Sequence, residues 1–207
     1  MNMHRKTRLL LCTCLLFCAF FAFCTVAQAR SDIVPIKNYS PKFTADLSEY
    51  KGKRVYLMNF DNQARDTTVW YYFSPDGKFA YGSSSLIHNY FWYSFERALI
   101  SLGMWVSNMD KPDPYAPAVW MTLKSITDAN FIVELKLQKF IYGVSFTKTY
   151  TVAGEELPVN AEQRTREYLE KRAYNMTNKL FETILNDPEF KKTFLKAVAD
   201  MAPSRVK

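Results

Sequence analysis

Two carboxylates, Asp61 and Asp66, come nearest in type and spacing to a catalytic pair in this sequence. Paired carboxylates can divide the roles of general acid and general base at one substrate. Here they flank Arg65 in a polar segment, where a local salt bridge explains the same three residues. We favour this structural interpretation, and a carboxylate-dependent enzyme remains the alternative.

Histidine, serine and glycine add no further catalytic pattern. His88 is the sole histidine after residue 29, so a His-based metal centre lacks its other ligands. The serines at 83–85 lie near His88, but they precede a predicted helix, where serine commonly acts as a cap. The six glycines do not form a phosphate-binding loop. We therefore expect no catalytic residues, no cofactor and no metal.

The first 29 residues have the three-part pattern of a secretory signal. Residues 1–8 are basic, residues 9–26 are uncharged and mostly apolar, and Ala27-Gln28-Ala29 places small residues at the cleavage site. We predict cleavage after Ala29 and export to the periplasm. Two alternatives keep the chain at a membrane: an uncleaved anchor, since about 18 apolar residues is near the minimum span, and an atypical lipidation at Cys24.

Removal of this segment changes the chemistry of the chain. The signal segment contains all four cysteines, so the mature chain has no disulfide framework and no thiolate. It also contains three of the 27 basic residues, which leaves 24 against 20 acidic residues, a net charge of about +4. These charges are spread through the chain rather than gathered in a stripe, so we expect no nucleic-acid partner.

The remaining residues predict one domain at 51–202, preceded by a polar leader or tether at 30–50 and followed by a tail at 203–207. A first strand is expected at 54–60. The runs 67–73 and 78–81 flank Ser-Pro-Asp-Gly at 74–77, a turn sequence that predicts a hairpin. Apolar residues recur with helical spacing over 86–102 and stop at Gly103, and a short strand follows at 104–106.

The second half of the domain predicts a meander and two helices. Strands are expected at 118–127, 131–138 and 144–152, and the middle one alternates apolar and polar residues. Asn160, with Gln163 as its capping-box partner, predicts the start of a long helix, and Pro188 predicts the first position of a last one. The fold class is therefore α+β, a mostly antiparallel sheet with helices packed on one face, in a two-layer sandwich.

Aromatic residues are the unusual feature of the domain. Residues 70–73 are consecutive aromatics, so about half of them must point away from the buried face of a strand. Trp92 and Tyr93 lie at the edge of the apolar stripe of the helix at 86–102. Trp70, Tyr72, Trp92 and Tyr93 are therefore candidate contacts for a protein or a lipid. In the alternative interpretation, the leader or the last helix covers these rings.

The order of these segments resembles small envelope proteins of Gram-negative bacteria, the ABC-type transport auxiliary lipoproteins and the YajG-like lipoproteins. The matching parts are the Lys-Gly-Lys-Arg-Val-Tyr-Leu strand at 51–57, the segment at 59–65 and the helix-Gly-strand passage at 95–106. The chain departs from the group because it lacks a good lipidation motif. The resemblance implies a non-catalytic periplasmic part of an assembly that moves lipid, and it transfers no binding residues.

Together these features predict an exported, non-catalytic accessory or binding protein of an envelope assembly. Its expected partner is a protein, and a lipid or membrane surface is a second candidate. Two alternatives remain. One is the carboxylate-dependent enzyme, and the other is a lipid carrier, which requires an apolar cavity between helix and sheet.

Overall fold

The computed structural model describes residues 31–139 and 143–201. The predicted signal segment with its cleavage site at Ala29, the candidate lipidation site Cys24 and the tail at 203–207 lie outside these residues. No helix among the described residues is long and apolar enough to cross a membrane.

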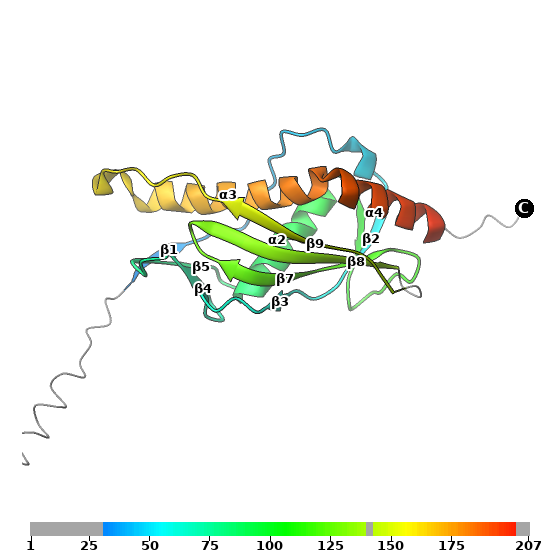
Figure 1. Cartoon of the computed structure of the whole chain (residues 1–207), viewed down its shortest axis with the longest axis horizontal. Helices are drawn as coiled ribbons and strands as arrows, with labels where there is room; N and C mark the ends of the chain where they lie inside the picture. Colours follow the sequence, from blue (N-terminus) through cyan, green and yellow to red (C-terminus); the bar gives the residue numbers. More distant parts are fainter. Residues whose placement is uncertain (1–30, 140–142, 202–207) are drawn as a thin grey trace, which may run out of the picture. The chain divides into compact units, whose positions relative to one another are not determined.

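Helices and strands of the domain are coloured along the chain in Figure 1. The strands are β1 (Asp32–Pro35), β2 (Arg54–Leu57), β3 (Asp61–Asn62), β4 (Tyr71–Phe73), β5 (Phe79–Gly82), β6 (Trp105–Ser107), β7 (Ala118–Ile126), β8 (Asn130–Lys139) and β9 (Gly143–Ala153). The helices are α2 (Ile87–Ser101), α3 (Arg166–Asn186) and α4 (Pro188–Met201), with 3-10 turns η1 (Ser48–Tyr50) and η2 (Ala161–Gln163).

The main sheet has the strand order β6-β2-β7-β8-β9, with β3 also paired to β7. Strands β7, β8 and β9 form the predicted antiparallel meander. Strand β2 pairs in parallel with both β6 and β7, and β3 pairs in parallel with β7. Parallel neighbours require a crossover, and between β2 and β6 the crossover includes α2. The α+β class is confirmed, and the main sheet is mixed, with its longest pairings antiparallel.

The predicted hairpin forms, but in a second, three-stranded sheet. Strands β4 and β5 are antiparallel around a turn in which Gly77 has a φ of 68° and its N–H donates to the Ser74 carbonyl at 2.8 Å. The third strand is β1, which pairs in parallel with β5. An isolated bridge between Phe73 and Thr127 connects this small sheet to the end of β7.

The predicted leader is part of the domain rather than a free tether. Val34, Leu47 and Tyr50 are buried in the main core, and the Tyr50 hydroxyl donates to the Leu185 carbonyl at 2.8 Å. The domain therefore begins at Asp32 and not at Lys51. The leader's apolar residues are too widely spaced to show a period, which is why sequence patterning identifies no element there.

The helices follow their predicted ranges with one correction. Gly103, at a φ of 74°, follows the end of α2, and Asp187 Oδ1 accepts from the Glu189 N–H at 3.1 Å at the start of α4. Asn160 does not begin the long helix. It caps η2, whereas α3 begins at Arg166, where the Thr165 hydroxyl accepts from the Tyr168 N–H at 3.2 Å.

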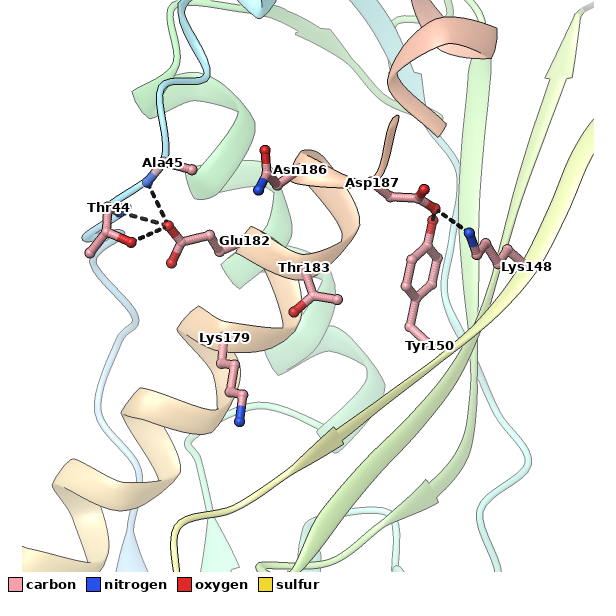
Figure 2. Close-up of a pocket in the computed structure, with 9 residues that line it drawn as sticks. All are labelled: Thr44, Ala45, Lys148, Tyr150, Lys179, Glu182, Thr183, Asn186 and Asp187. Atoms are coloured by element: carbon pink, nitrogen blue, oxygen red, sulfur yellow. Dashed lines mark hydrogen bonds and ion pairs between the residues drawn. The ribbon is translucent and has the colours of Figure 1, made fainter. Parts of the chain in front are cut away.

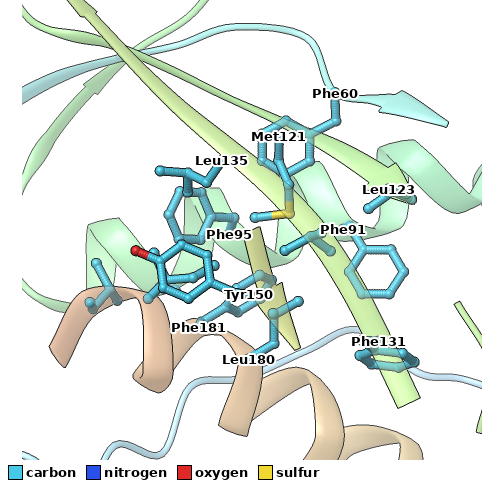
Figure 3. Close-up of a cluster of buried hydrophobic side chains, with 14 of the residues drawn as sticks. Phe60, Phe91, Phe95, Met121, Leu123, Phe131, Leu135, Tyr150, Leu180 and Phe181 are labelled. Carbon is cyan, nitrogen blue, oxygen red and sulfur yellow. The ribbon is translucent and has the colours of Figure 1, made fainter. Parts of the chain in front are cut away.

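Large apolar side chains fill the space between the helices and the main sheet. The alternation predicted for β8 is confirmed, because all four of its predicted core residues are fully buried: Phe131, Val133, Leu135 and Leu137. Phe91 and Phe95 of α2 and Phe181 of α3 meet this face of the sheet in Figure 3. Ring pairs with centroids 5.1–5.3 Å apart link Phe91 to Phe131 and Phe95 to Phe181.

A buried polar network at the end of this core joins the two sheets to α3. The Arg172 guanidinium donates to the carbonyls of Glu155 and Asp128 and lies 3.5 Å from Asp128 Oδ2. The same carboxylate oxygen accepts from the Tyr81 hydroxyl of β5 at 2.7 Å. A Cβ at Gly154 would lie 2.5 Å from Arg172 Nη2, so the network needs a glycine at that position.

Arg172→Met is expected to lower the free energy of unfolding by about 3–5 kcal/mol, because it leaves the Asp128 carboxylate buried without its cation. The double variant Arg172→Met/Asp128→Asn should be more stable than the single one, because it also removes the charge. Urea denaturation at neutral pH measures both. Lys37→Met is the control: its exposed ion pair with Glu170 should be worth under about 1 kcal/mol. A double variant no more stable than Arg172→Met would contradict this account.

Candidate functional site

Asp61 and Asp66 make separate structural contacts. Asp66 accepts from the Ser125 hydroxyl at 2.5 Å and from the Ile126 N–H at 2.9 Å, so it holds the end of β7. Asp61 is exposed and accepts from the Gln63 side chain at 2.7 Å. These contacts indicate structural roles for both carboxylates. The salt bridge that we expect between them and Arg65 is not among the ion pairs of the described residues.

His88 and the neighbouring serines also have structural settings. His88 is half-buried in the first turn of α2. The Ser83 hydroxyl donates to the Ser85 carbonyl at 2.8 Å, within the turn that precedes the helix. Across residues 31–139 and 143–201, no three histidine, cysteine or acidic side chains come together in a geometry that could hold a metal ion.

A groove of about 610 Å³, lined mostly by polar residue types, lies between α3, β9 and the segment at 44–45. Figure 2 shows its lining, which is Thr44, Ala45, Lys148, Tyr150, Lys179, Glu182, Thr183, Asn186 and Asp187. On one side, the Glu182 carboxylate accepts from the Thr44 hydroxyl at 2.6 Å and from the backbone N–H groups of Thr44 and Ala45 at 2.7 Å. Glu182 thus links the segment at 30–50, which the sequence predicts as a leader, to α3.

On the other side of the groove, Asp187 accepts from the Tyr150 hydroxyl at 2.6 Å and lies 2.9 Å from Lys148 Nζ. Burial acts to raise the pKa of Asp187, but the hydrogen bonds from Tyr150, Lys148 and the Glu189 N–H, together with the Lys148 charge, outweigh burial and the net shift is downward. The pKa of Lys148 is raised, chiefly by its hydrogen bond to Asp187. Burial, followed by the bond to Asp187, raises the pKa of the Tyr150 hydroxyl.

These pKa shifts favour the charged forms of Asp187 and Lys148 and the protonated form of Tyr150. The groove is therefore suited to structural support or to binding a polar group.

The four aromatic residues proposed as contacts have different environments. Tyr72 is buried, with its ring stacked on Tyr81 at 4.9 Å, so its assignment as a surface contact is wrong. Trp92 is half-buried and its indole N–H donates to the Met58 carbonyl at 2.8 Å. Tyr93 and Trp70 are each about half exposed. The aromatic run at 70–73 therefore contributes both to the core and to the surface.

The edge strand β6 exposes Trp105, and two further exposed apolar side chains, Met109 and Tyr115, follow it in the chain. Trp105 is 72% exposed and lies beside Arg54 of β2, which pairs with Asp113 at 3.2 Å. Asp113 also accepts from the backbone N–H of Tyr115 at 2.9 Å. We call Arg54, Trp105, Met109 and Tyr115 the Trp105 surface.

Met109 connects this surface to α2. Its sulfur accepts from the buried Tyr56 hydroxyl at 3.0 Å, while its side chain stays about half exposed. Met109 also lines a hollow of about 270 Å³ that includes Trp92 and Tyr93. The predicted α2 contacts thus lie at the margin of the Trp105 surface.

Strand alternation is the sequence signal that could have identified Trp105. Met104 is buried and Val106 packs against the core, so the residue between them points to the opposite face of the strand. Tyr115 has a weaker signal, because it lies in the loop with Pro112, Pro114 and Pro117, where side-chain direction does not follow from a period.

No family model matches the chain, and no curated protein matches it. A crystal structure of a protein from Xanthomonas campestris, described by the family model DUF330, superposes with a TM-score of 0.52. The superposition covers 81% of this chain and 98% of that one, at 12% sequence identity. The two chains share a fold. A crystal structure of an uncharacterized protein covers 75% of this chain and 99% of its own, at 9% identity and a TM-score of 0.46.

Tyr150→Phe should lower the free energy of unfolding by about 1.5 kcal/mol at neutral pH, because Asp187 loses a hydrogen bond to its charged form. A carboxyl group whose pKa is lowered by folding stabilises the fold above its unfolded pKa of 3.8, and loses this effect as pH falls through the folded pKa. The difference between variant and parent should therefore shrink below pH 3.8, as urea denaturation across pH will show.

Tyr93→Phe is the matched control for this experiment, since the Tyr93 side chain is about half exposed. Its effect should stay within about 0.5 kcal/mol at every pH. A Tyr150→Phe effect that is independent of pH would show that the hydroxyl does not act through the ionised carboxylate.

Proposed function

We propose that this protein is an exported, non-catalytic accessory protein that binds a protein partner in the cell envelope through the Trp105 surface. Support for export comes from the signal pattern of the first 29 residues. Support for partner binding comes from the exposure of Trp105, Met109 and Tyr115 on adjoining segments.

The composition of the Trp105 surface is the observation that carries this proposal. Exposed apolar side chains that adjoin one another are a feature of interaction sites, whereas single exposed ones are ordinary. Tryptophan, tyrosine, methionine and arginine are the residue types enriched in protein interfaces, and the first two and arginine dominate binding energy. The surface combines all four types around the Arg54–Asp113 ion pair.

The edge position of Trp105 adds a second mode of contact. Strand β6 is paired with β2 and ends the main sheet on that side. The outer edge of a terminal strand carries backbone groups that can pair with an extended segment of another chain. A partner that adds a strand to β6 would bring its own side chains against Trp105.

The alternatives receive less support from the same contacts. Asp61 and Asp66 each have structural partners, and the pKa shifts of Asp187 and Lys148 in the groove favour their charged forms. A lipid carrier needs a cavity between helix and sheet, and fully buried rings occupy that space: Phe91, Phe95, Phe131 and Phe181. The resemblance implies an assembly that moves lipid. We propose that, in such an assembly, this chain binds another protein.

A photoreactive residue at position 105 in the native host should cross-link to one envelope protein, which mass spectrometry then identifies. With that protein purified, Trp105→Ala and Tyr115→Ala should each raise the Kd at least about tenfold, the effect expected of residues at the centre of an interface. Calorimetric titration of the domain measures the Kd, and thermal unfolding confirms that each variant is folded.

Trp70→Ala is the matched control, because it removes another tryptophan, 47% exposed, that directly precedes β4 of the small sheet. It should leave the Kd within about twofold of the parent value. Equal losses for Trp70→Ala and Trp105→Ala, or no loss for Trp105→Ala, would contradict the proposed surface.

A further inference from the structure

The hollow of about 270 Å³ beside α2 lies at the carboxyl ends of two parallel strands. Because β2 and β6 run in the same direction, the segments that leave them begin at the same edge of the sheet. This edge is a common place for ligands in open sheets with parallel strands. The lining residues follow β2, belong to α2 or follow β6: Asn59, Phe60, Asn89, Trp92, Tyr93, Asn108, Met109 and Asp110.

Polar side chains of the hollow are free to bind a ligand. The side chains of Asn59, Asn89 and Asp110 make no hydrogen bond to another described residue. Asn89 is half-buried in the first turn of α2. The Asn108 side-chain oxygen accepts from the Asp110 N–H at 3.1 Å, which holds the turn after β6. Amides donate and accept and carboxylates accept, so the hollow offers both kinds of group.

Two aromatic rings give the hollow an apolar wall. The Trp92 indole N–H donates to the Met58 carbonyl at 2.8 Å, which fixes the position of this ring. The Tyr93 ring stands nearly perpendicular to it, with an interplanar angle of 87° and centroids 5.1 Å apart. Tyr93 is about half exposed, so a ligand can reach this corner from solvent.

The lining selects a class of ligand. None of the lining residues is basic, so the hollow offers an anion no counter-charge. An apolar ligand would take water from the free amides without replacing its hydrogen bonds, which is costly. A saccharide meets both conditions, because its hydroxyls donate and accept and its C–H faces pack on aromatic rings. A volume of 270 Å³ is close to the lower limit of about 300 Å³ for small-molecule pockets, so it suits one sugar ring.

We propose that this hollow binds one ring of a saccharide. The ring packs on Trp92 and Tyr93, and its hydroxyls form hydrogen bonds with Asn89 and Asp110. Tyr93 also lines a second hollow of about 240 Å³, whose polar groups include Ser84 and Arg97. A neighbouring sugar unit can bind there, so the saccharide is either a free sugar or part of a glycan.

This site goes beyond the proposed protein contact. It shares only Met109 with the Trp105 surface. A change at Asn89 should therefore weaken saccharide binding and leave the Kd for the envelope partner unchanged. Failure of either proposal is visible without the other.

The test titrates the full chain, purified in a detergent without sugar, with glucose, galactose, N-acetylglucosamine, maltotriose and triacetylchitotriose. At least one of these should change the tryptophan emission saturably. Asn89→Ala should raise that Kd about fivefold or more, because a hydrogen bond to the ligand is lost. Alanine is favourable in a helix, so the variant should fold, and thermal unfolding checks this.

Asn175→Ala is the matched control, because Asn175 is a half-buried asparagine of α3 outside the hollow. Its Kd should stay within about twofold of the parent value. A trisaccharide that binds at least about tenfold more tightly than its monosaccharide identifies a glycan as the ligand, and similar affinities identify a free sugar.

The absence of a saturable response to all five saccharides would overturn the proposal, as would equal losses in Asn89→Ala and Asn175→Ala. Inorganic phosphate is titrated in parallel. Saturable phosphate binding that Asn89→Ala weakens would overturn the assignment of a saccharide to this hollow.

Discussion

The buried guanidinium of Arg172 holds together parts of the chain that local structure alone would leave separate. It reaches the carbonyl of Glu155 beyond β9 and both the carbonyl and the carboxylate of Asp128 between β7 and β8. Through Tyr81, the same carboxylate fixes β5 and hence the three-stranded sheet. Since a buried charge is costly unless paired and hydrogen-bonded, these segments have one favourable arrangement. The three-stranded sheet therefore has a defined direction relative to the main core.

Elements with strong local periodicity were predictable from the sequence. Each of three features is visible within about a dozen residues of sequence: the alternation of β8, the helical stripe of α2 and the Ser-Pro-Asp-Gly turn of the hairpin. The role of β1 was not predictable, because its four residues gain their strand from parallel pairing with β5, more than forty positions away. The parallel pairing of β2 with both neighbours has the same origin. Such long-range pairing depends on packing rather than on local propensity.

The candidate surfaces show the same limit. Trp92 and Tyr93 lie on α2, where the helical stripe already placed them at the margin of the buried face. Tyr72 was misassigned because alternation shows that half of a strand's residues are buried but not which half. In the structure, the Tyr72 ring stacks on Tyr81, and Tyr72 therefore lies on the buried face of β4. Trp105 lies between two core residues and could have been found, but its strand is three residues long and gives little pattern to measure.

If the protein acts through the Trp105 surface, its backbone amide exchange should change at that surface, and little elsewhere, when it joins its assembly. Hydrogen–deuterium exchange of the chain in its native envelope complex, compared with the purified chain, tests this most directly. The account predicts slower exchange of the backbone amides at 105–115 in the complex, with the groove residues of α3 unchanged. Unchanged exchange at 105–115, with protection confined to the groove at Lys148 and Glu182, would contradict it.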